Sequence, residues 1–277
     1  MTVVVVTDAS SRLPADLRDK WAIRVVPLHI LLDGVDLRDG VDEIPDDVHD
    51  RHATTAAATP AELGAAYQHA LADSDGDGVV AVHISSALSG TYGVAERAAA
   101  ELGSAVRVID SKSAAMGTGF ITLAAARVAA GGGDVDAVAA AASSAVSRTH
   151  AFMVVHRLDN LRRSGRIGGA KAWLGTALSL KPLLHIEDGK LVLAQRIRTV
   201  NHSTRAMIDR VCEVVGEGSA ALAVHHVANP DGAHEVAAAL AQRLPACEPA
   251  IVTPMGPVLG LHVGAGAVAV CLELAAT

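Results

Sequence analysis

The strongest constraint on the fold is a series of short segments that are apolar at nearly every position and alternate with helix-prone segments. Strands of this kind are buried on both faces, as in a parallel sheet covered by helices on two sides. The strand-like segments are residues 2–8 (TVVVVTD), 23–32 (IRVVPLHILL), 78–84 (GVVAVHI) and 105–110 (AVRVID). The helix-prone segments are residues 60–73, 111–133 and 135–148. The pattern predicts an α/β fold with a mostly parallel sheet, interrupted by an acidic, irregular excursion over residues 35–58.

A second unit is predicted to begin near Ala151, and 277 residues suffice for two domains with separate cores. Residues 183–199 have the pattern of a hairpin that turns at Asp188-Gly189. The other predicted elements are strands at 151–156 and 221–227, helices at 168–180, 203–216 and 231–243, and two final strands around MGPVLGLHVGAG. We therefore expect an N-terminal α/β domain at residues 1–150 and a C-terminal α/β domain with a mixed sheet at residues 151–277.

The charge balance and the aromatic content disfavour a general nucleic-acid binder. Asp and Glu outnumber Lys and Arg by 30 to 23, which gives a net charge of −7. Aromatic residues make up only 2% of the chain, so few side chains are available to stack on bases.

The sequence also favours a cytoplasmic protein. The first residues, MTVVVVTDAS, lack the basic region of a signal peptide. Residues 249–272 contain no charged side chain, but their three prolines and four glycines predict strand, turn and strand instead of a membrane span. Three widely separated cysteines, Cys212, Cys247 and Cys271, are typical of small core residues in a reducing compartment.

Hydroxyl groups follow three of the predicted strands, in TDASS (7–11), HISSALSGT (83–91) and IDSKSAA (109–115). The carboxyl ends of parallel strands meet at one edge of a sheet, where ligands commonly bind. Hydroxyls and helix N-terminal amides at that edge suit an anionic head group. The same residues also cap helices routinely, so the pattern alone leaves both interpretations open.

Familiar catalytic and metal-binding motifs fit poorly. Ser89 lies in A-L-S-G-T and not in the G-x-S-x-G of a nucleophile elbow, and no P-loop lysine follows Gly90 or Gly93. The thirteen histidines form neither H-x-x-x-H nor H-E-x-x-H, and His225 and His226 would point to opposite faces of a strand. We expect no catalytic residue, no metal and no cofactor.

With these pieces in order, the chain resembles the DegV family of bacterial fatty-acid-binding proteins. The likeness covers nearly the whole chain and depends on several motifs that are weak alone and specific together. They are VVTDASSRLP, ISSALSGTYG (84–93), VIDSKSAAMGTG (108–119), LRRSGRIGGAKAWLG (161–175), LSLKPLLHIEDGKL (178–191), RIRT (196–199) and GPVLGLHVGAG (256–266).

The resemblance implies two α/β domains with a long-chain fatty acid buried between them and its carboxylate held by Thr55, Ser89 and His262. It also implies a partner, a fatty acid kinase that converts the carboxylate to an acyl phosphate for phospholipid synthesis. Two departures stand out. The T-S-Q-P element of the family is TAAA here (55–58), which puts side-chain hydrogen bonds near the head group in doubt, and its G-P-G turn is GAG (264–266).

Energetics agree with a carrier. Burial of about 14 methylenes at about 0.8 kcal/mol each gains on the order of 11 kcal/mol, whereas a neutral head-group site adds about 1–3 kcal/mol. The helix after the fourth strand offers Met116, Phe120, Ile121 and Leu123 as an expected aliphatic lining, although core packing explains the same stripe.

Two arginines are predicted to lie near the polar end of the ligand or to contact a partner: Arg166 in LRRSGR and Arg198 in RIRT. A solvated basic face is the alternative. Two other functions remain open from the residues, namely a hydrolase or phosphotransferase that uses Ser89 and His262, and a regulator that binds a phosphorylated ligand.

Overall fold

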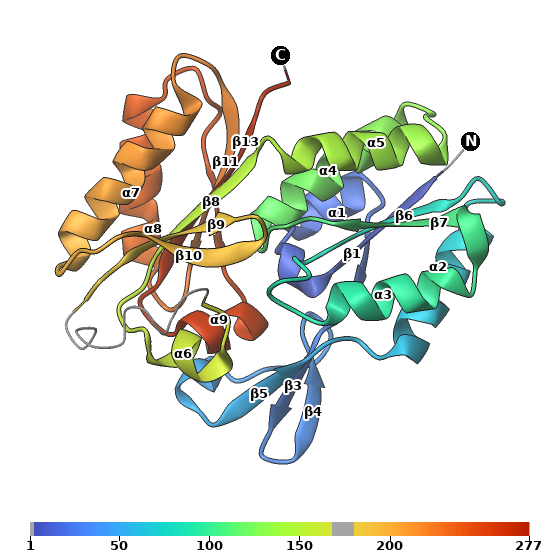
Figure 1. The fold of residues 1–277 in the computed structure, drawn as a ribbon, viewed down its shortest axis with the longest axis horizontal. Helices are drawn as coiled ribbons and strands as arrows, with labels where there is room; N and C mark the ends of the chain where they lie inside the picture. The colour runs from blue at the N-terminus through green and yellow to red at the C-terminus, as the bar shows by residue number, and fades with distance from the viewer. Residues whose placement is uncertain (1–2, 168–179, 277) are drawn as a thin grey trace.

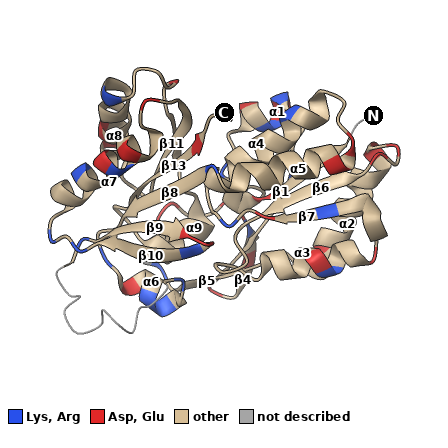
Figure 2. Ribbon diagram, turned by 45° about the horizontal axis from the view of Figure 1, so that its top comes forward, with Lys and Arg blue, Asp and Glu red and all other residues tan. Residues whose placement is uncertain are grey.

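A computed structural model describes residues 3–167 and 180–276, which form three sheets and the helices around them (Figure 1). The strands of the two larger sheets are largely free of charged residues, which gather on the helices and loops (Figure 2). This distribution agrees with sheets that are buried on both faces.

The first sheet is four-stranded and wholly parallel, in the order β2-β1-β6-β7. Its strands are β1 (Val4–Asp8), β2 (Arg24–Val26), β6 (Val79–His83) and β7 (Val106–Asp110). Along β6, Val79 and Ala81 face α2 (Pro60–Asp73) and α3 (Thr91–Ala100). Val80 and Val82 face α4 (Met116–Ala130) and α5 (Val135–Val146). A short helix, α1 (Ala15–Lys20), links β1 to β2. The predicted α/β fold with a parallel, doubly covered sheet is confirmed.

A small antiparallel sheet, in the order β4-β3-β5, corrects two predictions. Residues 23–32 are not one strand: β2 ends before Pro27, and β3 (His29–Leu32) belongs to the small sheet. Proline has no backbone N–H to donate to a neighbouring strand, so the chain leaves the parallel sheet at Pro27. The predicted irregular excursion contains β4 (Val35–Arg38) and β5 (Ala53–Ala56), and β5 carries Thr55.

The third sheet is six-stranded and mixed, in the order β10-β9-β8-β13-β11-β12, with only β11 and β12 parallel. The strands are β8 (Thr149–Val154), β9 (Leu183–Glu187), β10 (Lys190–Gln195), β11 (Ala220–His226), β12 (Ile251–Pro254) and β13 (Val268–Leu274). Asp188 and Gly189, both with positive φ, turn β9 into β10 as predicted. One face packs on α7 (Val200–Val215) and α8 (Pro230–Arg243). The helix predicted at 168–180 falls outside the described residues, apart from its last position.

The segment around MGPVLGLHVGAG differs from the prediction, because a helix, α9 (Pro257–Val263), lies between the two final strands. Pro257 occupies the first turn, where its missing N–H costs nothing. Gly256 and Gly264, with φ of 80° and 83°, bound the helix at its two ends. His262 therefore projects from a helix and not from a strand.

Helix α4 joins the two large sheets, since the core around it contains β1 and β6 side chains together with Ala151, Ala223 and Cys271 from the mixed sheet. Near the small sheet, α6 (Asp159–Ser164) packs close to α9, which also contacts β5 (Figure 1). Because α4 contacts both sheets, a division of the chain at residue 150 stays a prediction. None of the helices within the described residues is both long enough and apolar enough to cross a membrane.

Candidate functional site

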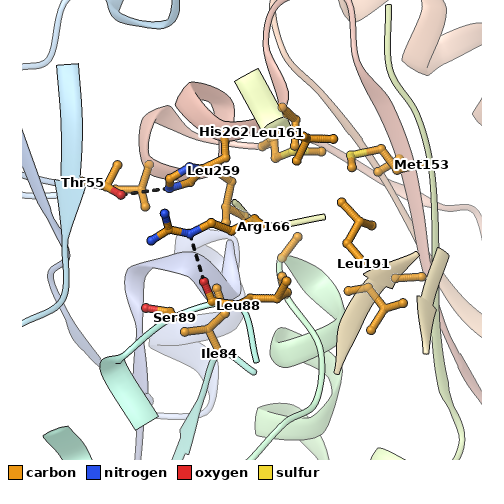
Figure 3. A pocket seen from close by; sticks show the side chains of 18 of the residues that line it. Thr55, Ile84, Leu88, Ser89, Met153, Leu161, Arg166, Leu191, Leu259 and His262 are labelled. Carbon is orange, nitrogen blue, oxygen red and sulfur yellow. Dashed lines mark hydrogen bonds between the residues drawn. The ribbon is translucent and has the colours of Figure 1, made fainter. Parts of the chain in front are cut away.

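A cavity of about 290 Å³ lies where the first sheet, the mixed sheet and α9 meet. Its walls come from β5, the turn after β6, β8, β13, α6 and α9 (Figure 3). Most of the lining is aliphatic and includes Ile84, Leu88, Met153, Leu161, Leu191 and Leu259. This volume is close to the lower limit of the usual range for small-molecule sites, about 300–1,000 Å³.

Small side chains on the mixed sheet create this space. Ala151 on β8 pairs in register with Cys271 on β13, and Met153 pairs with Ala269 two positions further along. The face that carries these residues is turned toward the first sheet and α9. The opposite face carries larger side chains, such as Val270 and Leu272, which pack on α7 and α8. Small and large side chains thus alternate along β13, so that one face of the sheet is filled and the other leaves room for the cavity.

The polar groups of the cavity are gathered at one end. Figure 3 shows Thr55, His262, Arg166 and Ser89 together on one side, with Met153 and Leu191 on the far side. Thr55 Oγ1 lies 2.8 Å from His262 Nε2, so β5 and α9 are joined by a hydrogen bond at this end. The cavity is therefore amphipathic along its length, which suits a ligand with one polar end and an apolar body.

His262 is neutral at physiological pH. Burial, together with the nearby Arg166 guanidinium, lowers its pKa to about 4. A neutral imidazole has one donor and one acceptor nitrogen. If Nε2–H donates to Thr55, the hydroxyl hydrogen of Thr55 is left to donate to a ligand oxygen. His262 can then orient Thr55 as a donor without placing a second charge beside a bound anion.

Ser89 and Arg166 are held in place by neutral groups. Ser89 Oγ lies 2.9 Å from Thr91 Oγ1 and accepts from the Thr91 N–H at 3.3 Å, near the start of α3. Arg166 donates from Nε to the Leu88 carbonyl at 3.3 Å and from a terminal nitrogen to the Ser164 carbonyl at 2.5 Å. These carbonyls fix the guanidinium without neutralising its charge, which remains available to an anion.

The structure brings most of the predicted site residues together. Thr55, Ser89, His262 and Arg166 all line the cavity, and Ala56 and Ala57 line it without polar side-chain atoms. Arg198 does not. Its side chain is exposed in the segment between β10 and α7, so the prediction that it lies at the polar end of the ligand is not supported.

The predicted aliphatic lining is wrong. Met116, Phe120, Ile121 and Leu123 are at most 2% exposed and pack in the core between the first sheet and α5. None of them lines the cavity. Core packing, the alternative that the sequence left open, explains the stripe. The true lining lies on the mixed sheet and α9, where single apolar residues gave no periodic signal.

Most hydroxyls at the three strand ends are structural. Ser85 Oγ donates to the carbonyl of Gly189 at 2.7 Å and holds the β9–β10 hairpin against the turn after β6. Ser111 Oγ lies 3.0 Å from Thr118 Oγ1 at the start of α4. Among the serines of the described residues, only Ser89 lines the cavity.

A buried network under the same turn was not predicted. Asp8 is fully buried, and its carboxylate accepts from the Ile84 N–H at 3.0 Å and from His83 Nδ1 at 2.9 Å. His83 Nε2 lies 2.7 Å from the Tyr67 hydroxyl. Burial by itself would raise the pKa of Asp8, but hydrogen bonds from His83, Ser10 and Ile84 lower it. The ionised carboxylate fixes the strand end from which Ile84, Leu88 and Ser89 reach the cavity.

Two histidines with lowered pKa values, His225 in the core and the partly buried His262, predict a loss of stability in mild acid. Burial is the first cause in both, and the pKa falls from 6.5 to about 4 in His262 and to about 3 in His225. Below pH 6.5 the unfolded chain takes up protons at these residues that the folded chain does not. The free energy of unfolding therefore decreases as the pH is lowered. At pH 5 each histidine is expected to cost about 2 kcal/mol relative to pH 7.

Urea unfolding of the wild type and of His262→Gln at pH 7 and pH 5 checks this expectation. The variant should lose less stability between the two pH values, by about 2 kcal/mol. Carboxylates contribute equally to both proteins and cancel in the comparison. An identical pH dependence in the two proteins would show that His262 titrates normally in the folded state.

No group of three or more His, Cys, Asp or Glu side chains within residues 3–167 and 180–276 is placed to hold a metal ion. The cavity lining contains one cysteine, Cys271, and burial raises the pKa of its thiol to about 12. This thiol is therefore protonated and a poor nucleophile at neutral pH.

Comparison with known proteins places this geometry in a family. The profile of the DegV family, described as uncharacterised proteins, matches residues 2–275. A DegV domain-containing protein of Mycobacterium tuberculosis is 75% identical over 277 residues, which is 100% of this chain and 99% of the relative.

Two solved structures share the fold. The DegV family protein of Thermus thermophilus, described as fatty acid binding, is 31% identical with a TM-score of 0.90, and the match covers 99% of this chain and 100% of that one. DegV of Bacillus subtilis, described as a fatty acid binding protein, is 26% identical with a TM-score of 0.89 and the same coverage. Sequence and fold agree along nearly the whole chain, and the chain belongs to the DegV family.

Proposed function

We propose that this protein binds a long-chain fatty acid in the cavity, with its carboxylate at Thr55, Ser89 and His262. The observation that carries the proposal is the division of one cavity into a polar end and an aliphatic body. The two related structures that are described as fatty acid binding support the same ligand class. The acyl chain lies between the predicted domains at residues 1–150 and 151–277.

The aliphatic body supplies most of the affinity in this proposal. A buried methylene contributes about 0.8 kcal/mol, so a long chain outweighs any set of hydroxyl contacts. Thr55 and Ser89 orient the carboxylate, and the Arg166 guanidinium beside His262 favours its ionised form. Arg166 distinguishes this site from the purely neutral head-group site that the three residues alone would make.

A carrier fits the site better than a hydrolase. His262 Nε2 is paired with Thr55, and Ser89 is paired with Thr91, so the two residues of the alternative catalytic pair have other partners. The lining contributed by the described residues contains no Asp or Glu that could orient His262 as a general base. The protein then presents its ligand to a second protein, and a fatty acid kinase that forms an acyl phosphate is the partner we propose.

Denaturing extraction of the purified protein, followed by mass spectrometry, tests the proposal directly. We expect a long-chain fatty acid in near-equimolar amount, because tight burial of the chain survives purification. The same preparation is assayed on generic esters, with Ser89→Ala as the control. Absence of a lipid, or ester turnover that Ser89→Ala abolishes, would contradict a carrier function.

A further inference from the structure

The β9–β10 hairpin forms the cavity wall on the side remote from the polar end. Ile186 on β9 and Leu191 on β10 are paired in register, and both line the cavity. Figure 3 shows Leu191 across the aliphatic body from Thr55 and His262. With the carboxylate at Thr55, a long acyl chain therefore meets this hairpin with the end of its tail, whereas a short one does not reach it.

The tip of the hairpin extends beyond the pairs that β9 makes with its own sheet. The pairing of β9 with β8 ends at His185 and Phe152, one residue before Ile186. On the other side, β10 is the edge strand of the sheet, and an isolated bridge joins Leu191 to Ile167. The tip then reaches from the mixed sheet toward the first sheet (Figure 1). Contacts outside the mixed sheet therefore have to fix its position.

Ser85 supplies such a contact. This serine is fully buried in the turn after β6, and its Oγ donates to the carbonyl of Gly189 at 2.7 Å. Gly189 is buried at the tip, although Asp188 and Lys190 on either side of it are exposed. A Cβ at position 189 would overlap Ser85 Oγ, so the two segments are closely packed. The contact joins the first sheet to the mixed sheet.

The backbone of the same serine shapes the turn that leads to the polar end. The Ser85 carbonyl accepts hydrogen bonds from the N–H groups of Leu88 and Ser89, at 3.0 and 3.1 Å. Its N–H donates to the Ser113 carbonyl at 2.9 Å, and its hydroxyl accepts from the Ala87 N–H at 3.2 Å. Ser85 itself does not line the cavity. Because the bonds to Leu88 and Ser89 are made by the backbone, removal of the hydroxyl acts mainly on the hairpin.

We infer that Ser85 is a positioning residue that determines how tightly the site binds long acyl chains. Its hydroxyl holds the β9–β10 hairpin against the end of the tail. It does so from the same serine-rich turn as Ser89, which contacts the carboxylate in the proposed function. The inference rests on that function, because the tail must run from Thr55 toward the hairpin. A residue of the polar turn thereby selects for the length of the apolar tail.

Titration calorimetry on the delipidated full chain, with hexadecanoate and decanoate as probes, tests the inference. Ser85→Ala is expected to weaken binding of hexadecanoate about tenfold, which corresponds to lost burial of about two methylenes. Decanoate binding should change less than about twofold. A role in folding alone, or contact with the carboxylate, would change both affinities by the same factor. The ratio of the two affinities is therefore the diagnostic measurement.

Ser74→Ala is the matched control for Ser85→Ala. Ser74 is also fully buried, and its Oγ donates to the Leu71 carbonyl at 2.8 Å and accepts from the Gly78 N–H at 3.2 Å. The variant thus removes a hydroxyl with the same kinds of partner, at the end of α2 and away from the cavity. The ratio of the two affinities should equal that of the wild type.

Gly189→Ala breaks the same contact from the hairpin side and decides the inference where Ser85→Ala does not fold. The added methyl group displaces the tip from Ser85, and the φ of 77° disfavours alanine. Gly34→Ala is its control. The Asp33-Gly34 turn between β3 and β4 has the same dipeptide and a φ of 81°, and no described atom lies within 4 Å of a Cβ there. Only Gly189→Ala should lower the affinity ratio.

The outcomes separate this inference from the proposed function. The double variant Ser85→Ala/Gly189→Ala should lose no more affinity for hexadecanoate than the weaker-binding single variant, since both changes remove one contact. An equal loss for the two acids in the single variants, or affinities equal to those of the wild type, overturns the role of Ser85 and leaves the carrier function intact. Wild type that binds neither acid refutes the proposed function itself.

Discussion

Replacing Ala269 by Phe is expected to weaken binding of hexadecanoate by on the order of 100-fold. Ala269 lies on β13 beside Met153, at the end of the cavity that is remote from Thr55 and His262. A phenyl ring there fills the space for the end of the tail. Exclusion of about four methylenes, at about 0.8 kcal/mol each, costs about 3 kcal/mol of binding free energy, which corresponds to roughly 200-fold.

Decanoate serves as the internal control for Ala269→Phe, because its shorter tail does not reach the blocked end. Its affinity should change much less than that of hexadecanoate in the same calorimetric experiment. Ala140→Phe places the same side chain on the exposed face of α5, away from the cavity, and should change neither affinity. An equal loss for both acids in Ala269→Phe would show that the tail does not run from Thr55 toward Ala269.

Replacing Asp8 by Ala is expected to lower the free energy of unfolding by about 4 kcal/mol. The carboxylate accepts hydrogen bonds from Ser10, Ile84 and His83, and the residue is fully buried. Without it, these donors are left unsatisfied in the core, and removal of one member of a buried charged network typically costs 3–5 kcal/mol. Urea unfolding at pH 7 measures the change.

Asp110→Ala is the matched control for Asp8→Ala. Asp110 ends β7, which is separated from β1 by β6 in the same sheet, and accepts similar hydrogen bonds, from Ser86 and from the Lys112 N–H. These bonds are exposed to solvent, so water replaces them and the loss should be about 1 kcal/mol. Equal losses of unfolding free energy in the two variants would show that the stability contributed by the Asp8 network does not depend on its burial. Because the network holds Ile84 and the turn that follows it, Asp8→Ala should also weaken ligand binding.

The local sequence predicted the parts of this protein that depend on neighbouring residues. Strands such as β6 are apolar on both faces, and that property alone indicates a parallel sheet between two layers of helices. The β9–β10 turn was equally clear, since Asp188-Gly189 is the dipeptide that a two-residue hairpin favours. Thr55, Ser89, His262 and Arg166 were found through motifs whose order resembles that of the DegV family, and all four line the cavity.

Other features were decided only when distant segments packed together. The residues around His262 form a helix whose Val258 packs in one core cluster with Ile30 and Val48, far away in the chain, and a local pattern of apolar residues and glycines cannot contain that contact. The cavity is the space that remains beside small residues such as Ala151 and Ala269 once β8 and β13 pair in register. The chain's own residues thus specify its strands, helices and turns, because those depend on local geometry. The lining of the cavity follows from tertiary packing, because an empty volume belongs to several segments at once and to none of them separately.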